Sequence, residues 1–222
     1  MNLSKESQAR DDICRVGKSL FDRGYVHAAA GNISVKLDDG FLITPTDACM
    51  GFLDPARLSK MNTDVQQVSG DIASKTIAVH AHIYSANSLF STKVGCIIHT
   101  HSTHCVALSM QTPGIELLKA LTPYFVMKVG RVPVISYHRP GSPAAALEIA
   151  QTIGQYGQRG TPVRAIMQPR LGPTVWAANP FQAMAVLEEL EETSKLAFLN
   201  PEAMPLTDAQ IEDLRQTLNA IW

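Results

Sequence analysis

The sequence predicts an α/β fold built as one domain. Segments with alternating apolar residues, typical of strands, interleave along the chain with segments whose apolar residues recur at helical spacing. No linker or internal repeat divides these segments into separate parts. With 222 residues, the chain is long enough to bury a sizeable core of its own.

Composition and charge narrow the class of protein. Hydrophobic residues make up 45% and charged residues 18% of the chain, as in soluble globular proteins, and the net charge is −1. This charge gives no basic surface for nucleic acid and no polybasic patch for a membrane, whereas a small anionic substrate needs only local donors. The polar N-terminus carries no signal core, and no apolar run approaches the ~18 residues of a membrane span.

The four cysteines point to a reducing compartment. They show no C-x-x-C spacing, and Cys96 and Cys105 lie in apolar contexts typical of small buried side chains. Since nothing indicates a disulfide scaffold, we expect a cytoplasmic protein.

The first elements are a helix and a hairpin. Helical spacing predicts a helix over residues 5–23, ended by Gly24. The stretch "ISVKLDDGFLITPT" then alternates around Asp38-Asp39-Gly40, which predicts two strands joined by a turn. "VQQVSGD" predicts another short strand, and helical spacing returns from about 75 to 89.

The middle of the chain combines a buried strand with a helix. "VGCII" is fully apolar and ends in polar histidines, which predicts a buried strand that delivers side chains at its end. Ser102 can cap the helix that follows. "RVPVISY" is strand-like, and Ser142-Pro143 begins a helix through about Ile153 with proline at its first position.

The C-terminal third contains two further strands and two further helices. "RAIM" and "PTVWA" predict two strands joined by the loop "QPRLG". Asn179-Pro180 begins a long amphipathic helix, and Thr207 caps a last helix that carries Ile211, Leu214 and Leu218 on one face.

Three of the seven histidines lie within "GCIIHTHSTHCVALSM". His99 and His101 are two residues apart, a spacing that places both on one face of a strand but on different sides of a helix. Because the preceding residues predict a strand, the two imidazoles can converge on a metal ion; hydrogen-bonded structure is the alternative. Zinc requires three or four protein ligands. His104, one turn into the next helix, is a candidate third ligand or a helix-capping residue.

Several blocks, in order, resemble the class II aldolase/adducin family. They are "AAAGNISVKL", "FLITPTDA", "ASKTIAVHAHIY", "IIHTHS", "LTPYFVMKVGRVPVISYHRPG", "RLGPTVWA" and "LEELEETSKL". The resemblance runs from about Ile13 to Leu199, and Leu121 to Gly141 is most similar to the 3-oxo-tetronate 4-phosphate decarboxylase branch. It implies a single domain over 1–222, with its core at about 13–199 and a C-terminal helix at 207–222.

The resemblance implies a fold, an assembly and a chemistry. Members have a three-layer α/β/α fold with a central, mainly antiparallel sheet, and form C4 homotetramers with active sites between subunits. A divalent metal, usually zinc, is held by an H-x-H pair and a third histidine. It accepts the charge of an enediolate formed by aldol cleavage or decarboxylation, and a glutamate moves protons.

Carried onto this chain, the resemblance assigns a role to seven residues. His99 and His101 fall on the metal ligands, and Tyr124 on a tyrosine that serves aldolase relatives as proton donor. The positions that bind the substrate phosphate are Asn32, Thr46, Ser74 and Lys75. Without the family pattern, Asn32 and Ser74 could be turn or cap residues, and Tyr124 a core aromatic.

Three positions depart from the family pattern. Leu171 replaces the third metal-binding histidine, and Thr76 replaces the acid/base glutamate. Asp47 replaces a pocket glycine, where its carboxylate would repel a phosphate dianion; alternatively, aspartate tolerates the same turn and points to solvent.

Two hypotheses follow. The first is a metal-dependent carbon–carbon lyase that acts on a small sugar acid or hydroxy-keto acid. Decarboxylation is favoured over aldol cleavage because loss of CO₂ needs no base to begin, so Thr76 is less damaging. The second is a catalytically degenerate member of the family, retained to bind a ligand or a protein.

Overall fold

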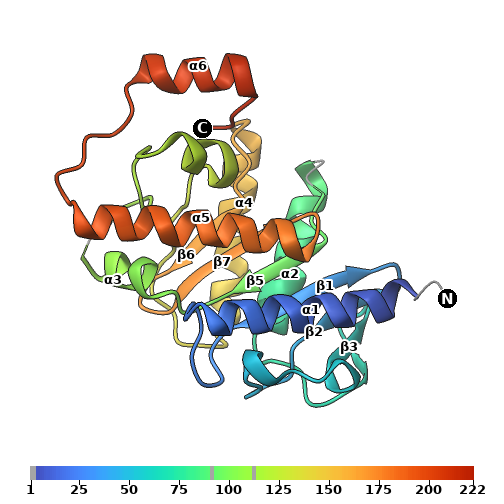
Figure 1. Cartoon of the computed structure of the whole chain (residues 1–222). Helices are drawn as coiled ribbons and strands as arrows, with labels where there is room; N and C mark the ends of the chain where they lie inside the picture. The colour runs from blue at the N-terminus through green and yellow to red at the C-terminus, as the bar shows by residue number, and fades with distance from the viewer. Residues whose placement is uncertain (1–3, 91–92, 112–113) are drawn as a thin grey trace.

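The computed structural model describes residues 4–90, 93–111 and 114–222. A seven-stranded sheet forms the middle layer of the molecule, in the order β4-β3-β2-β1-β5-β7-β6 (Figure 1). The strands are β1 (Asn32–Leu37), β2 (Gly40–Ile43), β3 (Ser59–Asn62), β4 (Gln67–Ser69), β5 (Cys96–His99), β6 (Ala165–Gln168) and β7 (Gly172–Ala177).

Every neighbouring pair of strands is antiparallel. The register is fixed in the middle of the sheet, where Asn32 of β1 lies opposite His99 of β5, and His99 lies opposite Thr174 of β7. The predicted fold class, α/β with a mainly antiparallel sheet, is therefore confirmed.

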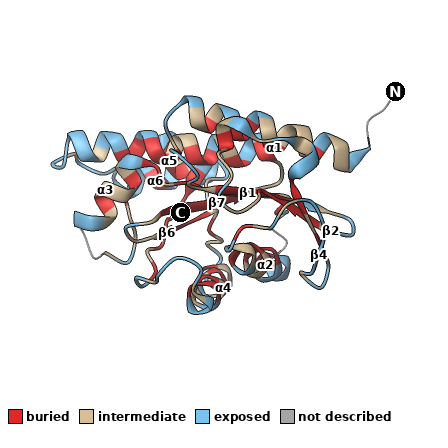
Figure 2. Ribbon diagram, turned by 90° about the horizontal axis from the view of Figure 1, so that it is seen from below, coloured by how far each residue is buried: buried red, intermediate tan, exposed pale blue. Residues whose placement is uncertain are grey.

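Helices cover both faces of the sheet (Figure 2). One face carries α1 (Lys5–Asp22), α3 (Thr103–Gln111) and α5 (Pro180–Leu199), and the other carries α2 (Ile77–Asn87) and α4 (Pro143–Gln158). The last helix, α6 (Asp208–Leu218), lies beyond α5 and the short π-helix η4 (Phe125–Val129). Each of these α-helices matches a helix that the sequence predicts.

The two helical layers form two separate cores. Since side chains alternate along a strand, Cys96 and Ile98 of β5 pack towards α1, α3 and α5, whereas Ile97 packs towards α2 and α4. By the same alternation, His99 belongs to the α2/α4 side. Trp176 and Ile166 fill the centre of that second core and are fully buried.

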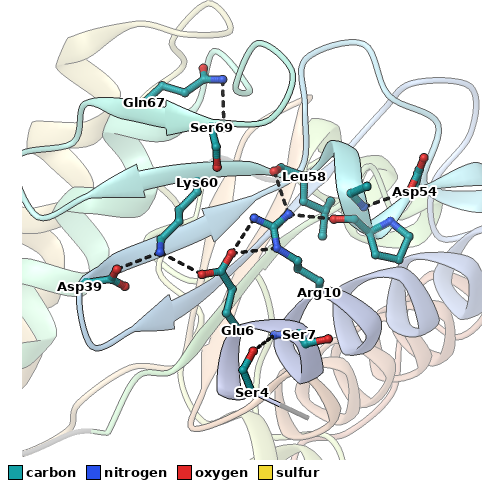
Figure 3. Close-up of polar contacts among 12 residues, drawn as sticks. Ser4, Glu6, Ser7, Arg10, Asp39, Asp54, Leu58, Lys60, Gln67 and Ser69 are labelled. Atoms are coloured by element: carbon teal, nitrogen blue, oxygen red, sulfur yellow. Dashed lines mark hydrogen bonds and ion pairs between the residues drawn. The ribbon is translucent and has the colours of Figure 1, made fainter.

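Helix α1 is fixed to the outer strands by a polar network (Figure 3). Arg10 donates to the carboxylate of Glu6 and to the carbonyls of Pro55 and Leu58. Lys60 of β3 lies between Glu6 at 2.9 Å and Asp39 of the β1–β2 turn at 2.8 Å. The network ties the hairpin, β3 and α1 together at the edge of the sheet.

Three local details differ from the sequence-based expectation. "RVPVISY" forms no regular strand; it makes only isolated bridges through Pro133 and Val134, because proline has no N–H to continue a ladder. Strand β3 was not predicted from the sequence; its position is fixed by antiparallel pairing with β2 and β4. The N–H groups at the start of α3 donate to Glu191 of α5, while the hydroxyl of Ser102 pairs with that of Thr100.

Within the described part of the chain, no helix combines the length and apolar character needed to cross a lipid bilayer.

Candidate active site

The candidate site lies at one end of the central strands β1, β5 and β7, which the antiparallel register places side by side. Asn32 begins β1, His99 ends β5, and Thr174 lies near the start of β7. Beyond β1, the chain after β2 pairs with the segment before α2, since Pro45 bridges Ala73. Residues far apart in sequence therefore meet at this end of the strands, which we call the rim.

His99 is buried with one ring nitrogen committed. Its Nδ1 lies 3.0 Å from the carbonyl oxygen of Pro173 and 3.1 Å from Oγ1 of Thr174. A carbonyl only accepts, so Nδ1 carries the proton and Nε2 keeps its lone pair. Burial, with a smaller contribution from His101, lowers the pKa of His99 to about 3, so the ring is neutral at pH 7.

His101 lies beside His99. Their ring centroids are 5.2 Å apart with an interplanar angle of 70°, so the H-x-H spacing does bring the two imidazoles together. Two imidazoles that share one zinc ion at Zn–N distances of about 2.0–2.1 Å have centroids roughly 5 Å apart. The pair has the spacing, the neutral charge and the free lone pair that a divalent ion requires.

A buried hydrogen-bond chain holds Asn32 next to this pair. Nε2–H of His80 donates to Oδ1 of Asn32 at 2.5 Å, and Nδ1 of His80 accepts from the Ser34 hydroxyl at 2.7 Å. Tyr84 continues the chain with a 2.9 Å contact to Ser34. Burial lowers the pKa of His80 to about 3, with a further contribution from His99. His80 is thus a neutral residue that orients Asn32.

Three other residues assigned to substrate binding come from two adjacent segments. Thr46 donates its backbone N–H to the carbonyl of Ile72 at 2.8 Å, and Ser74 donates its N–H to Thr44 at 3.3 Å. Ser74 is buried, whereas Lys75 is exposed. Thr46, Ser74 and Lys75 therefore lie along the same rim as Asn32.

Asp47 adopts the backbone conformation that favours glycine. Its φ is +55°, in the left-handed region, and its side chain is exposed. Asp47 and Thr46 also line a cavity of about 630 Å³ that continues to Arg57 and Asp71. The aspartate thus keeps the turn and places a negative charge at the mouth of this cavity.

The two other departures are visible in the structure. The hydroxyl of Thr76, where the resemblance implies a glutamate, pairs with that of Ser74 at 2.9 Å. Leu171 lies in the β6–β7 turn, which packs closely on the histidine segment. A Cβ on Gly172 would meet the Thr100 carbonyl oxygen at 1.9 Å, so the turn approaches the H-x-H as nearly as backbone can.

The structure argues against His104 as a third ligand. Its Nδ1 lies 2.8 Å from the carboxylate of Glu191, and its ring packs on Phe198, both on α5. His99, by contrast, belongs to the α2/α4 side of the sheet. The sequence interpretation of His104 as a metal ligand is wrong because α3 directs its ring into the opposite layer. His138, which follows the segment after η4, has its Nε2 2.6 Å from Glu148 and makes no described contact with His99 or His101.

Tyr124 is 62% exposed at the start of η4, and no contact joins it to the histidines of its own chain within the described residues. It is thus open to another molecule.

One residue of the site was missed from the sequence. His27, in the loop before β1, has its ring centroid 6.2 Å from that of His101 at an angle of 74°. His27 also contributes, after burial, to the lowered pKa of His101. It lies 72 positions before His99, so no spacing rule connects them; its place just before the "AAAGN" block was the only signal.

Comparison with known proteins agrees with the geometry. A family model described as Class II Aldolase and Adducin N-terminal domain matches residues 11–198. The 3-oxo-tetronate 4-phosphate decarboxylase of Cupriavidus necator is 46% identical, with 99% of this chain and 100% of that protein covered. The enzyme of the same name from Escherichia coli K12 is 36% identical over 95% of this chain and 96% of its own.

Solved structures give the same result. YgbL from Escherichia coli superposes with a TM-score of 0.85 at 35% identity, covering 96% of this chain and 100% of its own. An L-fuculose 1-phosphate aldolase shares the fold, with a TM-score of 0.80 at 19% identity and 98% of each chain covered. Curated relatives of this chain are decarboxylases and aldolases, that is, carbon–carbon lyases. The chain belongs to the class II aldolase and adducin family.

Proposed function

We propose that the chain is a metal-dependent carbon–carbon lyase that decarboxylates a small 3-oxo sugar acid. The observation that carries the proposal is the His99–His101 pair, 5.2 Å apart, in which Pro173 fixes the tautomer of His99 and leaves Nε2 open. The full-length similarity to proteins named 3-oxo-tetronate 4-phosphate decarboxylase supports the reaction and the substrate class.

The proposal gives the residues at the rim distinct roles. His99 and His101 would hold a divalent ion, zinc in this proposal, which would supply a Lewis acid for the substrate carbonyl. The bond to the carboxylate breaks, CO₂ leaves, and its electron pair moves towards that carbonyl. No base is required to begin, so a hydroxyl at Thr76 is compatible with the step.

The anionic end of the substrate is assigned to Asn32, Thr46, Ser74 and Lys75. His80 occupies Oδ1 of Asn32, and no described residue accepts a hydrogen bond from its amide nitrogen, so this N–H₂ group is available to a ligand. Lys75, which follows Ser74 in the chain and is exposed, adds a positive charge.

A proton must finally reach the carbon that lost CO₂. Tyr124 is the proposed donor, and its exposure supports delivery to the site of a neighbouring subunit in a cytoplasmic homotetramer. A neighbour's tyrosine would also shield the reacting carbon from bulk water.

Release of CO₂ from 3-oxo-tetronate 4-phosphate tests the proposal. The zinc-loaded wild type is expected to release CO₂, His99→Ala to lose at least about a thousandfold in kcat, and Tyr124→Phe to lose about a hundredfold, the usual size of a general-acid contribution. Sedimentation would show whether the active form is tetrameric.

The departures at Thr76 and Leu171 favour one competing function, a degenerate family member that only binds ligands. The double substitution Thr76→Glu with Leu171→His distinguishes the two. If the wild type is inactive and the double variant releases CO₂, the native chain is a decayed enzyme and the lyase proposal fails.

A further inference from the structure

The metal site proposed above lacks a third ligand. Among the described residues, no three His, Cys, Asp or Glu side chains lie close enough, as positioned, to share an ion. Two imidazoles alone hold zinc weakly, since zinc sites in proteins use three or four protein ligands. Leu171 cannot contribute, His104 is directed towards α5 on the opposite side of the sheet, and no described contact joins His138 to the pair.

The loop before β1 brings the remaining candidate to the site. Gly31 packs so closely on the end of β5 that an added Cβ would lie 2.7 Å from the carbonyl oxygen of His99. Val26, on the other side of His27, is 2% exposed. The loop between Val26 and Gly31 is thus fixed at both ends beside the end of β5, and His27 follows directly after the buried Val26.

The local geometry directs His27 towards His101. A tight turn, closed by the Ala30 N–H donating to the His27 carbonyl at 2.9 Å, contains Ala28 at φ +47°, a conformation that costs alanine about 1–2 kcal/mol. The surrounding structure therefore imposes this turn, as happens at functional sites. The His27 ring meets that of His101 edge to face at 6.2 Å.

We infer that His27 is the third protein ligand and replaces the histidine lost at Leu171. The inference rests on the proposed function, because it completes the same site. The 6.2 Å spacing exceeds the roughly 5 Å of two imidazoles on one zinc ion by about 1 Å. His27 is exposed, so its two side-chain torsions are free to change as the ring approaches an ion.

Metal binding to the full-length protein tests the inference without an activity assay. Chelator-stripped protein is titrated with Zn²⁺ against a chromophoric chelator, and with Co²⁺ to record its visible absorption. The wild type is expected to bind one ion with a tetrahedral Co²⁺ spectrum. His27→Ala should weaken binding by at least about a hundredfold, since even lost second-shell partners of a metal cost 10–100-fold. The matched control His82→Ala, whose ring is bonded to Ala78 within α2, should bind as the wild type does.

Moving the ligand gives a second readout. In a His27→Ala background, Leu171→His is expected to recover tight binding, because it restores a third imidazole from the β6–β7 turn. If His27→Ala binds as tightly as the wild type while His99→Ala does not bind, the inference is overturned and the proposed metal site stands. If the wild type itself binds no ion, both fall.

Discussion

At the scale of single residues, chemistry at the rim is set by which nitrogen of each histidine is already engaged. Nδ1–H of His99 donates a hydrogen bond to a backbone carbonyl, whereas His80 is satisfied at both nitrogens by Asn32 and Ser34. Of the buried and half-buried histidines that the structure describes at this site, His99 and His101 therefore keep a free ring nitrogen. The same residue type thus serves two purposes a few ångströms apart.

The buried His80 predicts a pH dependence of stability. The unfolded chain protonates this residue near pH 6.5, but the folded chain only near pH 3, because burial lowers its pKa. The free energy of unfolding should therefore fall as pH is lowered between these values, by up to about 1.4 kcal/mol per pH unit for this one proton.

His80→Gln tests this dependence, because glutamine can still donate to Asn32 but does not titrate. Urea denaturation of chelator-treated protein at pH 7, 6 and 5 should give a shallower pH dependence for the variant. Parallel curves for the two proteins would contradict a neutral, buried His80.

Asp47 predicts that the site binds a phosphorylated substrate less well than a charge-neutral variant would, because its carboxylate disfavours a phosphate group. Its exposed carboxylate should repel a phosphate group by about 0.5–1 kcal/mol, a size typical of charges at the surface. Asp47→Asn is expected to lower the KM of a phosphorylated substrate about twofold to fivefold, with the KM of the unphosphorylated analogue unchanged as the internal control. Equal effects on both substrates would show that the charge is not sensed.

At the scale of elements, α1 depends on a partly shielded charge network. Hydrogen bonds from Lys60 and then Arg10 lower the pKa of Glu6. Its stabilising effect is therefore complete above pH 4.5 and is lost as pH falls below that value through the folded-state pKa.

Glu6→Gln should lower the free energy of unfolding at pH 7 by roughly 0.5–1 kcal/mol after allowance for solvent screening, and by less at pH 3.5. The matched control is Asp38→Asn, which removes an ion pair with Lys5 whose side chains are 86% and 87% exposed. The role of the network would be contradicted if denaturation curves showed a larger loss of stability for Asp38→Asn than for Glu6→Gln.

Elements also show how far the sequence predicted the structure. Periodicity located every α-helix and the β1–β2 hairpin, because these features depend on neighbouring residues. The direction of His104 depends on Glu191, 87 residues away, and the approach of His27 depends on close packing at Gly31. Such long-range contacts leave no local pattern, so the histidine pair was predictable and its surroundings were not.

At the scale of the whole molecule, the C-terminal segment folds back on the body. Trp222 is 8% exposed, and its ring packs against Phe125 at 5.8 Å and under the guanidinium of Arg131 at 5.0 Å. Arg131 in turn pairs with Glu116, and Arg215 of α6 donates to the Trp222 carbonyl. Trp222 thus contacts α6 through Arg215, η4 through Phe125, and the segment after η4 through Arg131.

Trp222→Ala should lower the free energy of unfolding by about 2–4 kcal/mol, somewhat below the range for a central tryptophan, because it removes a large ring at the edge of the core. Leu218→Ala, at a position 51% exposed on α6, should change stability by less than about 1 kcal/mol. Thermal unfolding of both variants checks this ranking, which equal melting temperatures would contradict.

The antiparallel register that aligns Asn32, His99 and Thr174 has a consequence for biosynthesis. These three residues come from the beginning, the middle and the late part of the chain, so a nascent fragment that ends before β7 lacks the strand that holds His99 Nδ1. A newly made polypeptide must therefore complete its sheet before the orientation and tautomer of His99 are set.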